Sequence, residues 1–425
     1  MAFKPRKRLL LRLLIIIVIM AVAGLLAARF LRRPAPTDIR FASSFPGAAI
    51  PGYTYSGSDE VERLSSRTAT LLLTSQGWLQ SLRIAGLQTG QPAEPTMVLD
   101  AMDHMAAARV ALENADLTKL QTELSRIRST FVSQEGLVAA EALIDDAGKA
   151  ARSEGFANAP TLAWLRLLAE SYQLTGSSEL LQELRISSDS FLARTGPDGL
   201  LPADTQIILY QQPPPRDPEA TPTPKPSQEP TPAIESFRQV VRIADIDLYT
   251  MQLLQPLDER WQLVLDRNHA VLKAAALEGT VPLFQYAYDP AITDYIGFTG
   301  TQPLVETEAA LRVLLHIYEA GGKLPQTLTY LRNRFYESSV LPEQIDRVTG
   351  AAASESECIT GYALLARIAR LTTDATLYER SATRLLWHTA TNTRSEAYGA
   401  IFRTDPDNRI RVTARDNLLA LLALA

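Results

Sequence analysis

The sequence predicts an all-α protein of about twelve helices, and two features of the chain support this. From about Leu64 onward, apolar residues recur at steps of three and four, as in amphipathic helices, whereas the strict alternation of half-buried strands is almost absent. Short polar or glycine-containing junctions separate apolar helix ends at 172–181, 318–325 and 371–378. Turns this short join antiparallel neighbours, so we expect about six helical hairpins.

The same periodicity places the individual helices. One helix carries the apolar stripe Val98, Ala101, Met102, Met105, Ala108 and Leu112. Asn158, with Pro160 two residues later, opens another helix. Its apolar stripe is Leu162, Leu165, Leu168 and Tyr172. Further helices are expected at 259–277, 304–320, 355–371 and 374–390.

Hairpins of this kind can form an open solenoid or a closed ring. A solenoid of the tetratricopeptide type repeats every ~34 residues, and the chain shows no such period. We therefore expect a closed (α/α)6 toroid over residues 59–425.

A basic and apolar segment opens the chain. Residues 9–28 are apolar except for Arg12, and twenty helical residues span about 30 Å, the thickness of a bilayer's hydrocarbon core. A cleaved signal peptide would share this pattern. The run stays bulky to its end, however, and Arg29 follows it directly. We expect a retained transmembrane anchor at 1–33, an extended stalk at 34–58, and an extracytoplasmic remainder in a single-pass protein of the cell membrane.

A proline-rich segment interrupts the helical pattern within 211–234. Nine of the twenty residues from Pro213 to Pro232 are proline, so this stretch can neither form a helix nor pack as a core. It could separate two domains. Because neither flank alone holds enough hairpins to close a ring, we favour a disordered insertion within one toroid.

Charge and composition exclude several kinds of partner. Without the eight basic residues at 4–33, the chain has 34 Lys and Arg against 47 Asp and Glu, a net charge of about −13. An acidic body argues against nucleic acid as a partner. Cys358 is the only cysteine, and the four histidines show no pair at metal-ligand spacing, so we expect no metal and no cofactor.

No phosphate loop, nucleophile elbow or dinucleotide fingerprint occurs in the sequence, which leaves carboxylates and aromatic residues as candidate site residues. Glycoside hydrolysis requires two carboxyl groups beside a sugar-binding cleft, one protonated and one ionised. Toroids of helical hairpins often present such a cleft at one end of the ring.

The order of segments resembles glycoside hydrolase family 8, in particular its membrane-associated members encoded with exopolysaccharide synthesis. Those proteins carry a Ser-Glu-x-Gln-Gly stretch that opens an early inner helix and supplies the general acid. The chain reads Leu73-Thr-Ser-Gln-Gly-Trp78, so Gln76 and Gly77 match while Thr74 stands in the position of the acid. A second stretch that lines a sugar subsite falls at 158–166, where both of the family's acidic residues are missing.

Later segments match the family better. Residues 245–249 resemble its Asp-Leu-Tyr helix, 355–369 its penultimate inner helix and 416–421 its closing helix, and Glu306 falls where an Asp serves as general base in some members. The resemblance implies catalysis by Glu306 and polysaccharide contacts by Gln76, Trp78, Trp164, Asp247, Tyr249 and Tyr295.

Each candidate also has a structural interpretation. Glu306 and Glu308 lie about 200° apart on a helix, so only one of them can face a cleft. Asp247 could cap a helix, and a tryptophan at helical spacing could belong to the core.

The resemblance implies a membrane-anchored, extracytoplasmic protein that binds or guides polysaccharide beside the exopolysaccharide synthesis machinery, with a degenerate catalytic motif. One alternative is an active endo-glycosidase with a relocated general acid, for which Glu60 and Glu62 are the nearest candidates. Another is a helical-hairpin scaffold that binds protein partners.

Deletion of residues 213–232 tests the insertion. Because the segment offers no core, we expect the thermal midpoint of the protein to change by less than about 2 °C. Differential scanning calorimetry of both proteins measures this, and a loss of several degrees would mean that the segment packs on the toroid.

Overall fold

The computed structural model describes residues 39–425, apart from 42–44, 54, 56, 75–76, 86–97, 146–148, 211–233, 301 and 405–408. The chain divides into two units, Met1–Arg40 and Phe41–Ala425, and nearly all described residues belong to the second. No helix within the described ranges is long and apolar enough to cross a bilayer. The expected anchor lies outside these ranges, as does the expected insertion apart from Ile234.

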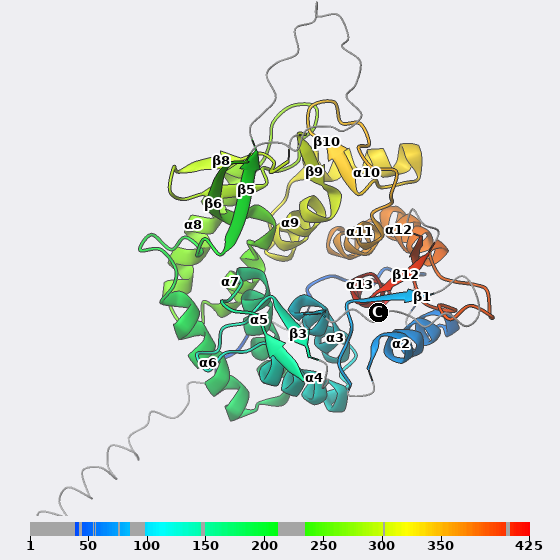
Figure 1. The fold of residues 1–425 in the computed structure, drawn as a ribbon, viewed down its shortest axis with the longest axis horizontal. Coiled ribbons are helices and arrows are strands. Elements are labelled where there is room, and N and C mark those ends of the chain that lie inside the picture. The colour runs from blue at the N-terminus through cyan, green and yellow to red at the C-terminus, as the bar shows by residue number, and fades with distance from the viewer. Residues whose placement is uncertain are drawn as a thin grey trace, which may run out of the picture. The chain divides into compact units, whose positions relative to one another are not determined.

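The described part of the second unit contains twelve α-helices that alternate between an inner and an outer layer (Figure 1). The inner helices are α3 (Ala101–Glu113), α5 (Asn158–Thr175), α7 (Leu248–Leu254), α9 (Thr307–Glu319), α11 (Ile359–Thr372) and α13 (Ala414–Leu424). The outer helices are α2 (Asp59–Leu72), α4 (Leu117–Thr130), α6 (Ser178–Leu192), α8 (Arg260–Ala275), α10 (Pro325–Ser338) and α12 (Ala375–Trp387). A short 3-10 helix, η1 (Ile243–Asp245), precedes α7.

The inner helices form a closed ring. Each packs on the next, from α3 through α5, α7, α9 and α11 to α13, and α13 packs back on α3 (Figure 1). In a ring of six, α3 therefore faces α9, and α5 faces α11. The predicted (α/α)6 toroid is confirmed, and so are the three junctions at 172–181, 318–325 and 371–378, which connect α5 to α6, α9 to α10 and α11 to α12.

Local sequence sets many of the helix ends. Side-chain oxygens of Ser58, Asp100, Asp116, Ser177, Asp247, Asp374 and Thr413 accept backbone N–H groups in the first turns that follow them. Gly176, with a φ of 69°, ends α5 in the left-handed conformation that favours glycine. The largest fully buried side chains include Trp164, Trp261 and Phe191.

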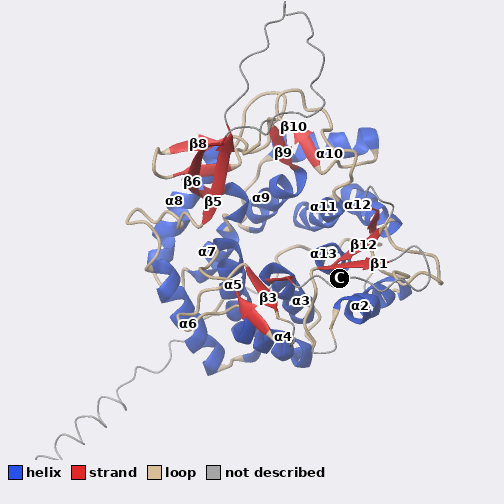
Figure 2. Cartoon of the chain, viewed as in Figure 1, coloured by secondary structure: helices blue, strands red, loops and turns tan. Residues whose placement is uncertain are grey.

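Short antiparallel strands, which the sequence did not predict, occupy the connections from each outer helix to the next inner helix (Figure 2). They form four sheets, with the strand orders β1-β12-β11, β10-β9, β2-β3-β4 and β5-β6-β7-β8. The strands are β1 (Leu82–Ala85), β2 (Val98–Asp100), β3 (Glu141–Ile144), β4 (Ala150–Arg152), β5 (Thr205–Tyr210), β6 (Ile234–Arg242), β7 (Ala287–Asp289), β8 (Asp294–Ile296), β9 (Leu304–Glu306), β10 (Gln344–Asp346), β11 (Arg403–Thr404) and β12 (Ile410–Thr413).

The two ends of the ring consequently differ. The sheets and the N-termini of the inner helices lie at one end, which we call the mouth. The inner helices pass to the following outer helices through short turns, such as 114–116 and 373–374, at the opposite end, which we call the base. The connections at the mouth are thus long, whereas those at the base are short turns.

The part of the expected stalk that is described packs on the base of the toroid. We call its residues between Phe41 and Tyr55 the strap. The Phe41 N–H donates to the Gln173 side chain on α5 at 3.0 Å, and the Ala48 N–H donates to the Arg370 carbonyl on α11 at 3.2 Å. Between them, the Phe45 ring centre lies 3.7 Å from the Arg367 guanidinium carbon. This section of the stalk therefore joins opposite sides of the ring.

Replacing Phe45 with alanine tests the strap. Loss of the cation–π contact and of apolar packing should lower the free energy of unfolding by about 1–2 kcal/mol. Denaturant unfolding of the full chain measures it, with Phe237→Ala as control, because Phe237 is 57% exposed and should change stability by about 0.5 kcal/mol or less. Equal effects from the two variants would mean that Phe45 does not hold the base.

Candidate functional site

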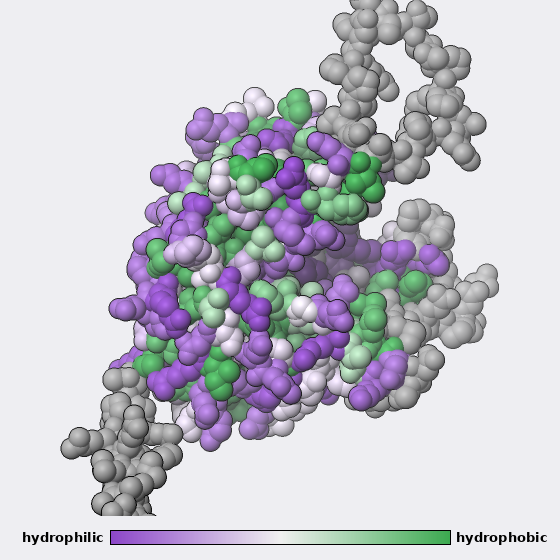
Figure 3. Space-filling view, turned by 60° about the vertical axis from the view of Figure 1, so that its left-hand side comes forward, coloured by the Kyte–Doolittle hydropathy of each residue, from purple (hydrophilic) through white to green (hydrophobic). Residues whose placement is uncertain are grey.

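A cavity follows the axis of the ring from the mouth inward. It has a volume of about 150 Å³, counted as room for the centres of water-sized spheres, and all six inner helices or the residues just before them line it. Figure 3 shows a recess with largely hydrophilic walls in the surface of the molecule. Inside the cavity the walls are mainly apolar, formed by Met102, Met105, Leu167, Leu315, Leu364, Leu419 and Leu422, with small alanines between them. No Phe, Tyr or Trp within the described ranges lines it.

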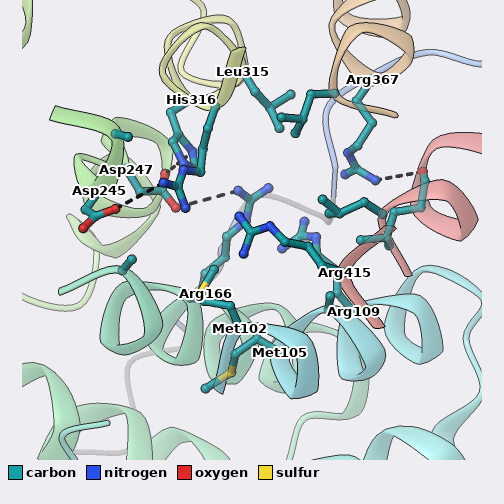
Figure 4. Close-up of a pocket in the computed structure, with 18 of the residues that line it drawn as sticks. Met102, Met105, Arg109, Arg166, Asp245, Asp247, Leu315, His316, Arg367 and Arg415 are labelled. Atoms are coloured by element: carbon teal, nitrogen blue, oxygen red, sulfur yellow. Dashed lines mark hydrogen bonds and ion pairs between the residues drawn. The ribbon is translucent and has the colours of Figure 1, made fainter. Parts of the chain in front are cut away.

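Buried ion pairs close the inner part of the cavity (Figure 4). Arg166 on α5 donates two parallel hydrogen bonds, of 2.8 and 2.9 Å, to the Glu319 carboxylate on α9. Its Nε also donates to Glu170 at 3.1 Å. Burial alone would lower the pKa of Arg166, but the two carboxylates and Asp247 raise it well above its usual value. The pair therefore stays charged and ties two inner helices that are not neighbours.

A second set of pairs continues this arrangement on the other side of the ring. Arg109 on α3 donates to Glu170 on α5 and to Glu113 on its own helix. Arg367 on α11 donates to both oxygens of Glu113, at 3.0 and 3.2 Å. The two sets share Glu170, which accepts from both Arg166 and Arg109. We call the resulting series of charged side chains the buried belt; in order, it runs Arg367–Glu113–Arg109–Glu170–Arg166–Glu319. It connects α11, α3, α5 and α9 across the interior.

One end of the belt meets a histidine–aspartate pair. His316 Nδ1 on α9 lies 3.3 Å from Asp247 Oδ1, at the start of α7. Burial lowers the pKa of His316, but Asp247 outweighs this and raises it to about 9. Burial conversely raises the pKa of Asp247, while His316 and Arg166 bring it well below the usual range. Both groups are therefore charged near neutral pH.

Asp247, His316 and Glu319 are also the one set of described residues that could hold a metal ion, with ligand atoms within 4.8 Å of one another. The donor set does not fit a cation well, because Arg166 already occupies Glu319 with two hydrogen bonds and His316 carries a proton. The expectation of no metal stays a prediction.

Three further carboxyl groups stand nearer the mouth. Glu308 on α9 accepts from Arg415 Nε on α13 at 2.8 Å and from the Thr360 hydroxyl at 2.9 Å. Burial raises the pKa of Glu308, but Arg415 and Arg312 lower it below its usual value. Asp245 lies 3.6 Å from Arg312.

The third group, Asp103 on α3, differs from the others. Burial, reinforced by the Asp100 carboxylate, raises the pKa of Asp103 to about 7. Around neutral pH this carboxyl group therefore keeps a proton part of the time, while Glu308 on the facing helix is ionised.

The predicted catalytic residue Glu306 does not line the axial cavity. It ends β9, its side chain is 55% exposed, and it lies 3.3 Å from Arg242 at a separate small pocket beside β7. Its neighbour Glu308 lines the axial cavity instead. The two carboxylates do diverge, but Glu306 lies in the strand before α9 and not on the helix as expected, and the one that lines the cavity is the one that was not selected.

The predicted substrate-binding residues occupy several different environments. Asp247 lines the cavity and also caps α7, accepting from the Thr250 N–H at 3.0 Å. Tyr249 is buried, with the Arg166 guanidinium 4.3 Å from its ring centre.

Trp164 is fully buried in the core, where no ring face is open to a sugar. The Tyr295 hydroxyl donates to the Val271 carbonyl of outer helix α8, outside the ring. Trp78 is partly buried, and Gln76 lies outside the described residues.

The position proposed for the general acid is corrected by the helix boundaries. Thr74 does not open an inner helix: its hydroxyl accepts from the Trp78 N–H at 3.0 Å in a tight turn between α2 and β1. The first inner helix begins at Ala101, directly after Asp100. Glu60 and Glu62 lie in the first turn of outer helix α2 and hence at the base, so neither can replace an acid at the mouth.

Sequence reasoning missed Asp103, Arg312 and Arg415. A usable signal was present in the spacing, because Glu308, Arg312, His316 and Glu319 recur at steps of three and four and therefore share one face of α9. Charged residues in such positions are seldom left without a partner or a function.

Comparison with known proteins supports the fold. No protein-family model and no curated protein sequence matches the chain. Among solved structures, a novel α-amylase from Clostridium perfringens is 17% identical with a TM-score of 0.67, covering 86% of this chain and 97% of that one. PssZ from Listeria monocytogenes is 11% identical with a TM-score of 0.56, covering 85% and 93%. A cold-adapted family 8 xylanase in complex with substrate is 11% identical with a TM-score of 0.55, covering 90% and 97%. The expected likeness to the family 8 toroid is thus confirmed for the fold.

The His316–Asp247 pair predicts a pH dependence of stability. Because the folded state raises the pKa of His316 from 6.5 to about 9, its contribution is complete below about pH 6.5 and is lost as the pH rises through 9. The loss should amount to roughly 1–3 kcal/mol. Denaturant unfolding at pH 6, 7.5 and 9.5 measures it in the original protein and in His316→Gln, which should lack this component. Parallel pH profiles for the two proteins would contradict the assignment.

Proposed function

We propose that the chain binds polysaccharide at the mouth of the toroid, outside the cytoplasm, and hydrolyses it slowly or not at all. The predicted anchor at residues 9–28 would tether it to the membrane, beside machinery that makes exopolysaccharide or other envelope glycan. The anchor rests on the sequence alone.

One observation carries the proposal of glycan binding. Each of the six inner helices, or the residues just before it, contributes to the lining of the axial cavity, and the first-turn residues Met102, Asp103 and Glu308 place part of that lining at the mouth. The chain shares its fold over nearly the full length of the solved xylanase and α-amylase described above. A cavity in which charged groups from several helices converge is, in such a fold, the natural place for sugar units.

The charges at the mouth argue for slow hydrolysis. Glu308 and Asp245 stand beside Arg415 and Arg312, and Glu306 stands beside Arg242. Arg415 and Arg312 lower the pKa of Glu308 below its usual value, so this carboxylate stays ionised near neutral pH and cannot give a proton to a leaving group. Among the described residues, no Phe, Tyr or Trp lines the cavity as a platform on which a sugar could stack.

An active hydrolase is the second candidate, and Asp103 favours it. Asp103 and Glu308 lie on facing helices and line the same cavity, and the pKa of Asp103 is raised to about 7 whereas that of Glu308 is lowered. In this case Asp103 would give its proton to the glycosidic oxygen while Glu308 accepted a proton from the attacking water. One protonated and one ionised carboxyl group are what an inverting mechanism requires.

Binding and turnover on one panel of polysaccharides separate these candidates. We expect the full chain in detergent to be retained on at least one insoluble β-glucan or xylan and to release reducing sugar at the rate of a boiled control. Asp103→Asn should leave binding unchanged, because it preserves the shape of the side chain.

Turnover that falls at least about 100-fold in Asp103→Asn would instead establish the hydrolase. If the protein shows no binding to any polysaccharide and no turnover of any, both candidates are contradicted, and a scaffold for protein partners is favoured.

A further inference from the structure

Arg312 on α9 is exceptional among the arginines of the axial cavity. Arg109, Arg166, Arg367 and Arg415 each donate hydrogen bonds to carboxylates. Arg312 makes no hydrogen bond within the described residues, and its nearest carboxylate oxygen, on Asp245, is 3.6 Å away. Its Nε is buried without a partner. A guanidinium with five N–H donors is thus placed in the cavity wall with its hydrogen-bonding capacity unused.

The electrostatic surroundings of Arg312 also show that it lacks a close carboxylate partner. Burial, together with the neighbouring charges of Arg415 and Arg242, lowers the pKa of Arg312 below its usual value. The pKa values of Arg109, Arg166 and Arg415 are raised by their carboxylate partners. Arg312 is therefore the cavity cation that would gain most from an added anion.

The shape of the cavity restricts what can deliver that anion. The buried belt closes its inner end, and Phe45 of the strap covers Arg367 from the base. Only a chain end or a side group can therefore enter. Half of the lining residues are Met, Leu or Ala, and their alkyl groups suit the C–H faces of one pyranose ring.

We propose that the axial cavity takes a terminal acidic sugar, a uronate, whose carboxylate is bound by Arg312. This inference rests on the proposed function and specifies its ligand. The ring of the sugar would lie against Met102, Met105 and Leu419, and its carboxylate would receive two N–H groups of the guanidinium.

The neighbouring carboxylates leave room for this anion. Glu308 is held by Arg415, and the raised pKa of Asp103 lets it carry a proton that could be shared with the ligand. The acidic charge of the whole protein acts at long range and is screened within about 10 Å at moderate ionic strength, whereas the Arg312 contact is direct.

Calorimetric titration of the full chain with matched trisaccharides tests the proposal. The probes are glucuronate, galacturonate and mannuronate trisaccharides and the neutral sugars obtained by reducing their carboxyl groups. We expect at least one uronate trisaccharide to bind about 10- to 100-fold more tightly than its reduced form. Arg312→Gln should abolish this preference, and Arg312→Lys should retain part of it.

Arg185→Gln is the matched control, because Arg185 is exposed on outer helix α6 and its loss changes the total charge equally. The thermal midpoint of each variant shows whether it folds. Equal affinity for acidic and reduced sugars, or a preference that survives Arg312→Gln, would overturn the inference.

The same measurements distinguish the inference from the function on which it rests. Binding of neutral sugars or of insoluble glucan without any preference for uronates would overturn the acidic ligand and leave polysaccharide binding intact. Failure of every trisaccharide and every polysaccharide to bind would overturn both.

Discussion

Burying Arg166 inside a ring of helices is tolerable only because Glu319 and Glu170 accept its N–H groups. An unpaired charge in such a place costs several kcal/mol, and removing one partner of a buried pair typically destabilises a protein by about 3–5 kcal/mol. The same requirement applies to Arg109 and Arg367, which share Glu113. Because the partners sit on different inner helices, the register and closure of the ring are fixed by the need to neutralise these charges together.

This constraint also divides the interior into two parts. Below, hydrogen bonds connect the charged groups of the belt to one another and Phe45 of the strap covers it, so this region is structural. Above, toward the mouth, Asp103 and Arg312 lack such saturated pairing, and the long connections that carry the sheets surround them. Stability thus resides in the lower part of the interior, whereas the upper part is free to meet a ligand.

Much of the fold could be predicted from sequence, because apolar periodicity and short polar turns report local structure directly. The junction at Gly176, for example, combines an apolar helix end with a residue suited to a positive φ. The strands were missed because most are only two to four residues long, too short for a periodic signal.

The position of the general acid was misplaced because a short match around Gly77 outweighed the amphipathic helix that begins at Ala101. Burial distinguishes Trp164 from a sugar platform, and it depends on tertiary packing that spacing cannot report. Likewise, the sequence selected Glu306 by its resemblance to the family, whereas the side chain that lines the cavity is that of Glu308.

Hydrogen–deuterium exchange with and without a bound polysaccharide tests the central claim, that ligand meets the molecule at the mouth and above the buried belt. We predict added protection in the first turns of α3, α9 and α13 and in the strands β2, β9 and β12 that precede them, with no change at the turns 114–116 and 373–374 of the base. Protection confined to the base or to the outer helices would contradict the account.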